Sequence, residues 1–91
     1  MITKNEDATV EETERTRGDE TLHYMLCRDI TDGRDSYSIR ALSYKSGVKV
    51  CQATACDVSS VYERAKEMYD AVANGFVEPY VLCDVIYDLL P

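Results

Sequence analysis

The feature that most constrains the fold is a set of three short segments in which apolar and polar residues alternate. They span residues 22–30, 36–45 and 48–55. Alternation with a period of two is typical of β-strands that bury one face. Asp32-Gly33 separates the first two segments and Ser46-Gly47 the next two, and such pairs favour tight hairpins because glycine tolerates positive φ. The sequence therefore predicts a three-stranded antiparallel meander.

After the third segment the hydrophobic period becomes that of a helix. Ser60 and Glu63 have the spacing of a capping box, although Ser59 or Asp57 could cap the helix instead. Gly75 suits a left-handed position just past the end of that helix. Pro79 suits the first turn of a second helix. The apolar positions of the two helices are Val61, Ala65, Met68 and Val72, and then Leu82, Val85 or Ile86, and Leu89. The predicted fold class is α+β, in the order β-β-β-α-α, with both helices packed on one face of the sheet.

Residues 1–20 are expected to form an acidic, disordered tail. This segment has seven acidic side chains but only three basic and four apolar ones. Such a composition buries too little apolar surface to offset the entropy of the chain. Residues 21–91 are expected to form a single small domain, because 91 residues are too few for two cores.

Composition excludes several classes of function. The chain has 17 acidic and 10 basic residues, a formal charge of −7, which argues against direct binding to nucleic acid. No apolar run approaches the roughly 18 residues of a membrane span, and the N-terminus lacks the basic start and apolar centre of a signal peptide. We therefore expect a cytoplasmic protein that binds neither nucleic acid nor a membrane.

The predicted register gives the sheet two different faces. With two-residue turns, His23 lies opposite Leu42, and Leu42 lies opposite Cys51. The face that the helices would cover carries Leu22, Tyr24, Leu26, Tyr37, Ile39, Ala41, Val48 and Val50. The second face mixes apolar and basic side chains, whereas a solvated face is plainly polar. Such a patch is typical of an interaction surface, although a solvated face or a cover formed by the tail are alternatives. The candidate partner-binding residues are Met25, Arg40, Leu42, Tyr44, Cys51 and Ala53.

No catalytic, cofactor or metal site is predicted. Without an export signal the four cysteines are expected to be reduced and at least half-buried, and their spacing lacks the second close pair of a zinc site. His23, the only histidine, would lie about 10 Å from Cys51 across the middle strand, too far for a shared metal or a catalytic pair. The glycines are isolated, so no phosphate-binding loop is present. A thiol-dependent or metal-dependent enzyme is therefore the weakest hypothesis.

The leading hypothesis is a small non-enzymatic interaction or regulatory module. Its partner is another protein or a second copy of the chain, since so small a domain gains stability from self-association. The alternative is an acidic mimic or inhibitor of a basic protein, such as one that binds nucleic acid. That alternative uses the tail and the helix carboxylates Glu63, Glu67, Asp70, Asp84 and Asp88.

The C-terminal part of the chain carries a sequence pattern that is similar to that of a known group of bacterial proteins. The stretch from Asp57 to Gly75, DVSSVYERAKEMYDAVANG, is followed by Val77-Glu-Pro79 and Asp84-Val85. This pattern resembles a family of short proteins of unknown function associated with clostridial and related gut Firmicutes. The resemblance covers residues 37–90 and leaves the tail outside it. It implies a bacterial cytoplasmic domain, and the family offers no assigned activity and no catalytic residues to transfer.

Overall fold

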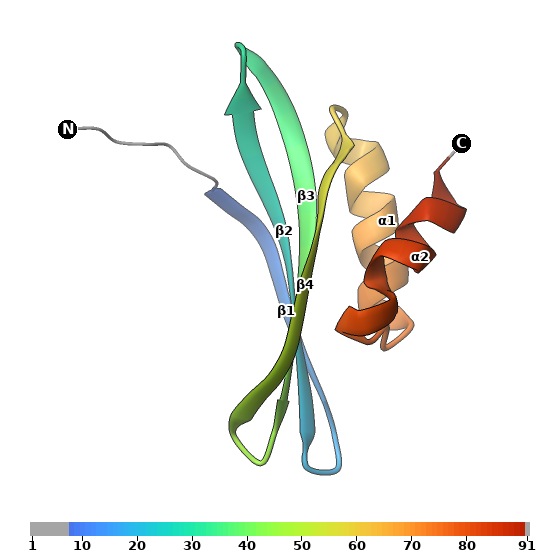
Figure 1. Ribbon diagram of the computed structural model, residues 1–91. Helices are drawn as coiled ribbons and strands as arrows, with labels where there is room; N and C mark the ends of the chain where they lie inside the picture. Colours follow the sequence, from blue (N-terminus) through green and yellow to red (C-terminus); the bar gives the residue numbers. More distant parts are fainter. Residues whose placement is uncertain (1–7, 91) are drawn as a thin grey trace, which may run out of the picture.

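A computed structural model, which describes residues 8–90, has a four-stranded antiparallel sheet with helices on one of its faces (Figure 1). The α+β class and the helices on a single face are therefore confirmed. The strands lie in sequence order across the sheet. The elements are β1 (Ala8–Arg17), β2 (Glu20–Thr31), β3 (Arg34–Lys45), β4 (Val48–Ser59), α1 (Tyr62–Asn74), a single 3-10 turn η1 (Pro79–Val81) and α2 (Leu82–Leu89).

The fourth strand, β1, lies in the segment that the sequence assigned to a tail. That prediction is wrong for residues 8–17, and residues 1–7 lie outside the described part of the chain. β1 pairs with β2 through a two-residue turn in which Gly18 has a φ of 63°. Its inward side chains are polar, and α1 supplies their partners. The Tyr69 hydroxyl donates to Thr13 Oγ1 at 2.6 Å, and the Tyr62 hydroxyl donates to Glu11 Oε2 at 3.0 Å.

Both predicted hairpins are present and fix the register at their tips. Asp32 and Gly33 have φ values of 54° and 76°, and Ser46 and Gly47 have 51° and 82°. Positive φ at both central residues is the signature of a type I′ turn, whose twist matches that of the flanking strands. The β2–β3 register is the predicted one along the whole ladder, with His23 opposite Leu42.

A β-bulge corrects the predicted register of β4. Lys49 pairs with Tyr44 and Cys51 with Ser43, so Val50 is an extra residue. Beyond a bulge of this kind the strand presents the opposite set of side chains to each face. Leu42 therefore lies opposite Gln52, not Cys51. Val48 and Val50, which the sequence assigned to the core, are 64% and 60% exposed.

The core lies between the sheet and the two helices, which pack side by side on it (Figure 1). Its largest fully buried side chains come from β2, β3 and all three helical segments. Tyr24 donates its hydroxyl to the carbonyl of Val77 at 2.9 Å, which joins β2 to the segment after α1. The remaining members include Leu22, Leu26, Ile39, Tyr69, Val72 and Leu82.

Both ends of α1 differ from the sequence prediction. The capping box does not form, because β4 continues to Ser59 and the helix starts only at Tyr62. Ser59 Oγ instead accepts the backbone N–H of Val61 at 2.9 Å. At the other end Gly75 has a φ of −88°, and Phe76 takes the left-handed conformation with a φ of 53°.

Contacts with β1 account for the unusual conformation of Phe76. The guanidinium carbons of Arg15 and Arg17 lie 4.9 Å and 4.8 Å from the centre of its ring. Cation–π contacts of this kind offset the cost of a left-handed non-glycine residue, which is about 1–2 kcal/mol. The ring thus ties the loop after α1 to β1. Pro79 opens the turn that follows, where the sequence placed it.

Candidate functional site

Within residues 8–90, one face of the sheet carries no helix, and we call it the open face. It is made by the side chains that alternate with the buried core positions of each strand. Figure 1 shows this face turned away from α1 and α2. The side chains of its central part are Glu12, Glu14, His23, Met25, Arg40, Leu42, Tyr44, Lys49, Gln52 and Thr54.

Four of the six predicted partner-binding residues come together on the open face. Met25 lies opposite Arg40, and Leu42 and Tyr44 continue the same row along β3. All four are half-buried, because long side chains on a twisted sheet cover one another. They form a mixed apolar and basic centre for this face.

The other two predicted residues, Cys51 and Ala53, do not belong to this face. The bulge at Val50 turns them to the helix-covered side, where Ala53 packs against the core. Gln52 and Thr54 take their places, so the β4 side of the open face is polar. The prediction failed there because it assumed an uninterrupted strand.

The open face has acidic side chains on one side and basic side chains on the other. Glu12 and Glu14 lie on the edge strand β1, whereas Arg40 lies on β3 and Lys49 on the opposite edge strand β4. The two glutamates lie in the segment that the sequence assigned to a tail. Glu12 and Glu14 do alternate with Thr13 and Arg15, but both sets are polar, so the segment carries only a weak strand signal.

Arg40 is half-buried and lacks a carboxylate partner within the described residues. None of the ion pairs found over residues 8–90 includes it, and its direct neighbours across the strands are Met25 and Thr54. A guanidinium that packs its stem on apolar side chains keeps its charged end available for a carboxylate. Arg40 is therefore the side chain of the open face whose charge is best placed to meet a carboxylate from outside the described residues.

His23 also lies on the open face, beside Glu12 and Glu14 of β1. Its Nε2 lies 2.6 Å from Glu12 Oε2, which orients the ring. A hollow of about 270 Å³ beside it is lined by Glu14, Thr21, Tyr44 and Gly47. Cys51, the thiol considered as its partner, is on the opposite face. Within residues 8–90 no three His, Cys, Asp or Glu side chains are placed to hold a metal ion.

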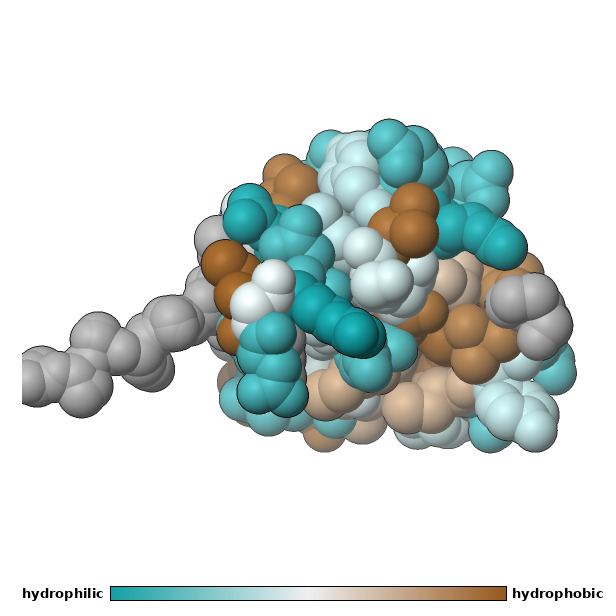
Figure 2. All heavy atoms as spheres, turned by 90° about the horizontal axis from the view of Figure 1, so that it is seen from above, coloured by the Kyte–Doolittle hydropathy of each residue, from teal (hydrophilic) through white to brown (hydrophobic). Residues whose placement is uncertain are grey.

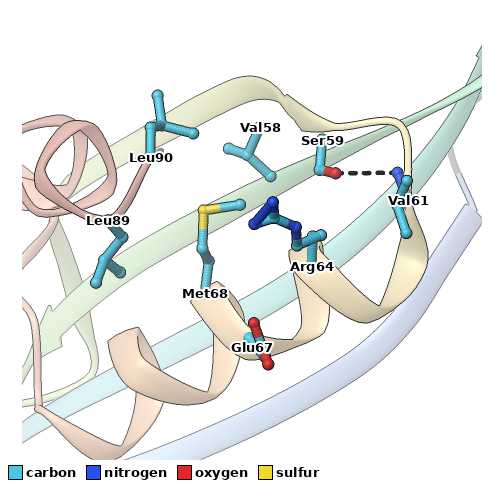
Figure 3. A pocket seen from close by; sticks show the side chains of 8 residues that line it. All are labelled: Val58, Ser59, Val61, Arg64, Glu67, Met68, Leu89 and Leu90. Carbon is cyan, nitrogen blue, oxygen red and sulfur yellow. Dashed lines mark hydrogen bonds between the residues drawn. The ribbon is translucent and has the colours of Figure 1, made fainter.

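A second hollow lies at the end of the helices, on the far side of the molecule from the open face (Figure 3). It has a volume of about 350 Å³ between α1, the end of β4 and the end of α2. Figure 2 shows hydrophobic atoms gathered over this end of the helices, while hydrophilic atoms dominate the rest of that view. Its lining is Val58, Ser59, Val61, Arg64, Glu67, Met68, Leu89 and Leu90.

Acidic side chains gather at the end of the sheet that carries the β2–β3 turn. Asp29, Asp32, Asp35 and Asp57 line a hollow of about 850 Å³ together with Arg34. Asp57 accepts the hydroxyl of Ser36 at 2.9 Å. On α1, the carboxylate of Asp70 accepts Lys66 Nζ at 2.8 Å, so part of the predicted acidic helix stripe is already paired within the chain.

Glu78 gives the fold a defined response to pH. Burial raises the pKa of Glu78, and a hydrogen bond with Glu20 raises it further, while Arg17 Nη2, 3.6 Å away, opposes both. A carboxyl group whose pKa is raised by folding favours its neutral form, so its contribution to stability is greatest below the ordinary glutamate pKa. That contribution is lost as the pH rises through the raised pKa.

The Glu78→Gln variant is therefore expected to be more stable than the parent at pH 7, with a melting temperature higher by about 1–4 °C. The gap is expected to close as the pH falls to about 4, where the parent carboxyl is also neutral. Thermal melts followed by circular dichroism from pH 4 to 8 measure this difference in melting temperature. Glu63→Gln, on the exposed side of α1, makes the same charge change and is expected to show no such gap. A Glu78→Gln protein less stable than the parent at pH 7 would show that the Arg17 contact outweighs burial.

Comparison with known proteins gives no family, curated relative or solved structure that matches this chain. Among the helices described here, none is long and apolar enough to cross a membrane.

Proposed function

We propose that the chain is a small, non-enzymatic cytoplasmic module that binds a partner protein through the open face. The observation that carries this proposal is Arg40, half-buried next to Met25 and Leu42 with no carboxylate partner in the described residues. Arg, Met and Tyr are enriched at the centres of protein interfaces, and energetic hot spots favour Tyr and Arg. A polar rim around such a centre is typical of an interface.

The face specifies the chemistry of its partner. Met25 and Leu42 require an apolar surface, and Arg40 requires a carboxylate. Glu12 and Glu14, on the β1 side, require basic groups. The partner surface therefore has an apolar centre, an acidic group that reaches Arg40 and a basic side that lies over β1.

A second candidate is an acidic binder of a basic protein. The observation that favours it is the group of aspartates at the β2–β3 end of the sheet, which come from three strands and share one hollow. Binding of this kind gains its rate and specificity from charge and weakens as salt screens it. It would not depend on the apolar centre of the open face.

The test replaces Leu42 with Glu in the full chain. A buried, unpaired charge at the centre of an interface is expected to weaken binding at least 100-fold, since each ~1.4 kcal/mol is a factor of ten. Partners are captured from an extract of the source cells, identified, and prepared in pure form. Their dissociation constants are then measured by calorimetry for the parent and the variant.

Glu63→Lys serves as the control, because it changes a charge on the exposed face of α1 and leaves the open face intact. The proposal expects a purified partner that binds the parent and the control with equal affinity and binds the Leu42→Glu variant at least about 100-fold more weakly. A partner that binds the Leu42→Glu variant as tightly as the parent contradicts the assignment to the open face. Steep weakening with salt for that same partner would favour the acidic binder.

A further inference from the structure

We infer that the partner on the open face is a second copy of this chain, related to the first by a two-fold axis that runs along the strands between β2 and β3. This inference rests on the proposed role of the open face. It commits to one arrangement of a face-to-face sheet dimer, in which the two open faces form the inner faces of a β-sandwich.

The charges of the open face are complementary to themselves under this rotation. A two-fold axis along the strands places β1 of one copy over β4 of the other and β2 over β3. Glu12 and Glu14 on β1 then lie over Thr54 and Gln52 of the second copy. Lys49 of that copy lies further along the same strand, and Arg40 lies on the neighbouring strand β3. Complementary potentials of this kind select one orientation over others.

The other possible two-fold axis, across the strands, is excluded by the same charges. It would place β1 over β1, so that Glu12 of one copy faced Glu14 of the second. Like charges brought together at an interface cost several kcal/mol. The axis along the strands keeps the two β1 strands apart. It places the β2–β3 ends of the two copies at the same end of the dimer, where Asp29 of each copy lies over Ser36 of the other.

The centre of the face also finds suitable partners. Met25 on β2 lies over Arg40 of the second copy, and His23 lies over Leu42 of the second copy. Glu12 is one strand away from Met25, so its carboxylate reaches the Arg40 guanidinium across the interface. The half-buried Arg40 thereby gains the carboxylate that residues 8–90 of its own chain do not provide.

The size of the face is adequate for a dimer. Four strands about 4.8 Å apart, with a rise of about 3.4 Å per residue, make a face about 14 Å by 40 Å before side chains widen it. The order of magnitude is that of a standard interface, which buries ~800 Å² on each partner. Twelve-residue strands at β2, β3 and β4 supply this length.

The experiment uses two charge-reversed versions of the full chain. The first carries Glu12→Lys and Glu14→Lys, and the second carries Arg40→Glu and Lys49→Glu. Each reversal gives the central part of the face charges of one sign, so each protein is expected to be monomeric, with a dissociation constant raised at least about 100-fold. An equimolar mixture of the two is expected to recover the dimer, because a basic centre then meets an acidic one. Analytical ultracentrifugation measures the oligomeric state of all four samples: the parent, each variant and the mixture.

The matched control carries Glu63→Lys and Glu67→Lys, the same change in net charge as the first version but on the exposed face of α1, and is expected to dimerise like the parent. Recovery of the dimer in the mixture also shows that both reversed proteins are folded. A parent that stays monomeric at several hundred micromolar overturns the inference. So does a dimer that either reversal leaves intact, or one that the mixture fails to restore.

These outcomes are separable from those of the Leu42→Glu experiment. A monomeric parent that still binds a different purified protein, and loses it with Leu42→Glu, overturns the second copy as partner and keeps the role of the open face. A dimer that neither Leu42→Glu nor the charge reversals disturb overturns both.

Discussion

A chain that begins at Glu20, and so lacks β1, is expected to lose cooperative folding. The loss removes the whole β1–β2 ladder and uncovers one side of β2, whose Leu22, Tyr24 and Leu26 are almost fully buried. It also removes Thr13, the 2.6 Å acceptor of the Tyr69 hydroxyl, and leaves that hydroxyl only the carbonyl of Tyr24 at 3.4 Å. Loss of such a hydrogen bond costs about 0.5–1.5 kcal/mol, and exposure of the apolar edge adds to it. Domains of this size have a total stability of only about 5–10 kcal/mol.

Thermal and urea melts followed by circular dichroism measure this loss. A point variant locates the effect in β1: Thr13→Val keeps the shape of the side chain but removes the acceptor for Tyr69, and is expected to cost about 0.5–1.5 kcal/mol. Thr16→Val, an exposed threonine of the same strand, is expected to change stability by less than about 0.5 kcal/mol. A truncated chain that melts as sharply as the parent would show that β1 is dispensable.

The same strand shows where sequence reasoning is weakest. A strand is recognised by contrast between apolar and polar positions, and VEETERTR offers little, because both of its faces are polar. Its inward residues, Glu11 and Thr13, are stabilised by tyrosine hydroxyls more than 50 positions later in the chain. No local pattern reports contacts of that range. The three following strands were predictable because each has its own apolar face and a turn that closes it.

The candidate site was also predicted correctly where a local turn fixes the strand register, and wrongly where the register changes within a strand. Met25, Arg40, Leu42 and Tyr44 were placed together correctly, since the Asp32-Gly33 turn fixes the β2–β3 register. The placement of β4 failed beyond its bulge. Val50 is an ordinary strand residue, so nothing in its identity announces that it lies outside the ladder. A one-residue shift was enough to move Cys51 and Ala53 to the other face and to change the composition of the candidate interface.

Phe76 and Gly75 show a similar limit. Glycine is the residue that sequence rules place in a left-handed position after a helix. Here a phenylalanine takes that conformation, and the two arginines that flank its ring belong to β1. Ala71 O would lie 3.0 Å from a Cβ at Gly75, so the glycine serves close approach to the helix instead.

Ile39→Ala is expected to destabilise the fold strongly while leaving the chain length unchanged. Ile39 is fully buried at the centre of the sheet, between Leu26 on β2 and Ala55 on β4. Removing its outer carbons leaves a cavity that the strands cannot close, because both neighbours are held by backbone ladders. Isoleucine-to-alanine changes at such sites cost about 2–5 kcal/mol, which for a chain of this size lowers the melting temperature by about 10–25 °C.

Ile30→Ala is the matched control, since it makes the same chemical change on the same sheet. Ile30 is 58% exposed near the β2–β3 turn, so truncation there creates no cavity and is expected to cost less than about 0.5 kcal/mol. Urea melts at one pH give the free energy of unfolding of each variant. Because both variants lose the same β-propensity, the difference between these free energies reports the effect of burial. If the two variants unfold at nearly the same urea concentration, Ile39 does not lie in a closed core, and the packing of α1 and α2 on this face of the sheet would have to be revised.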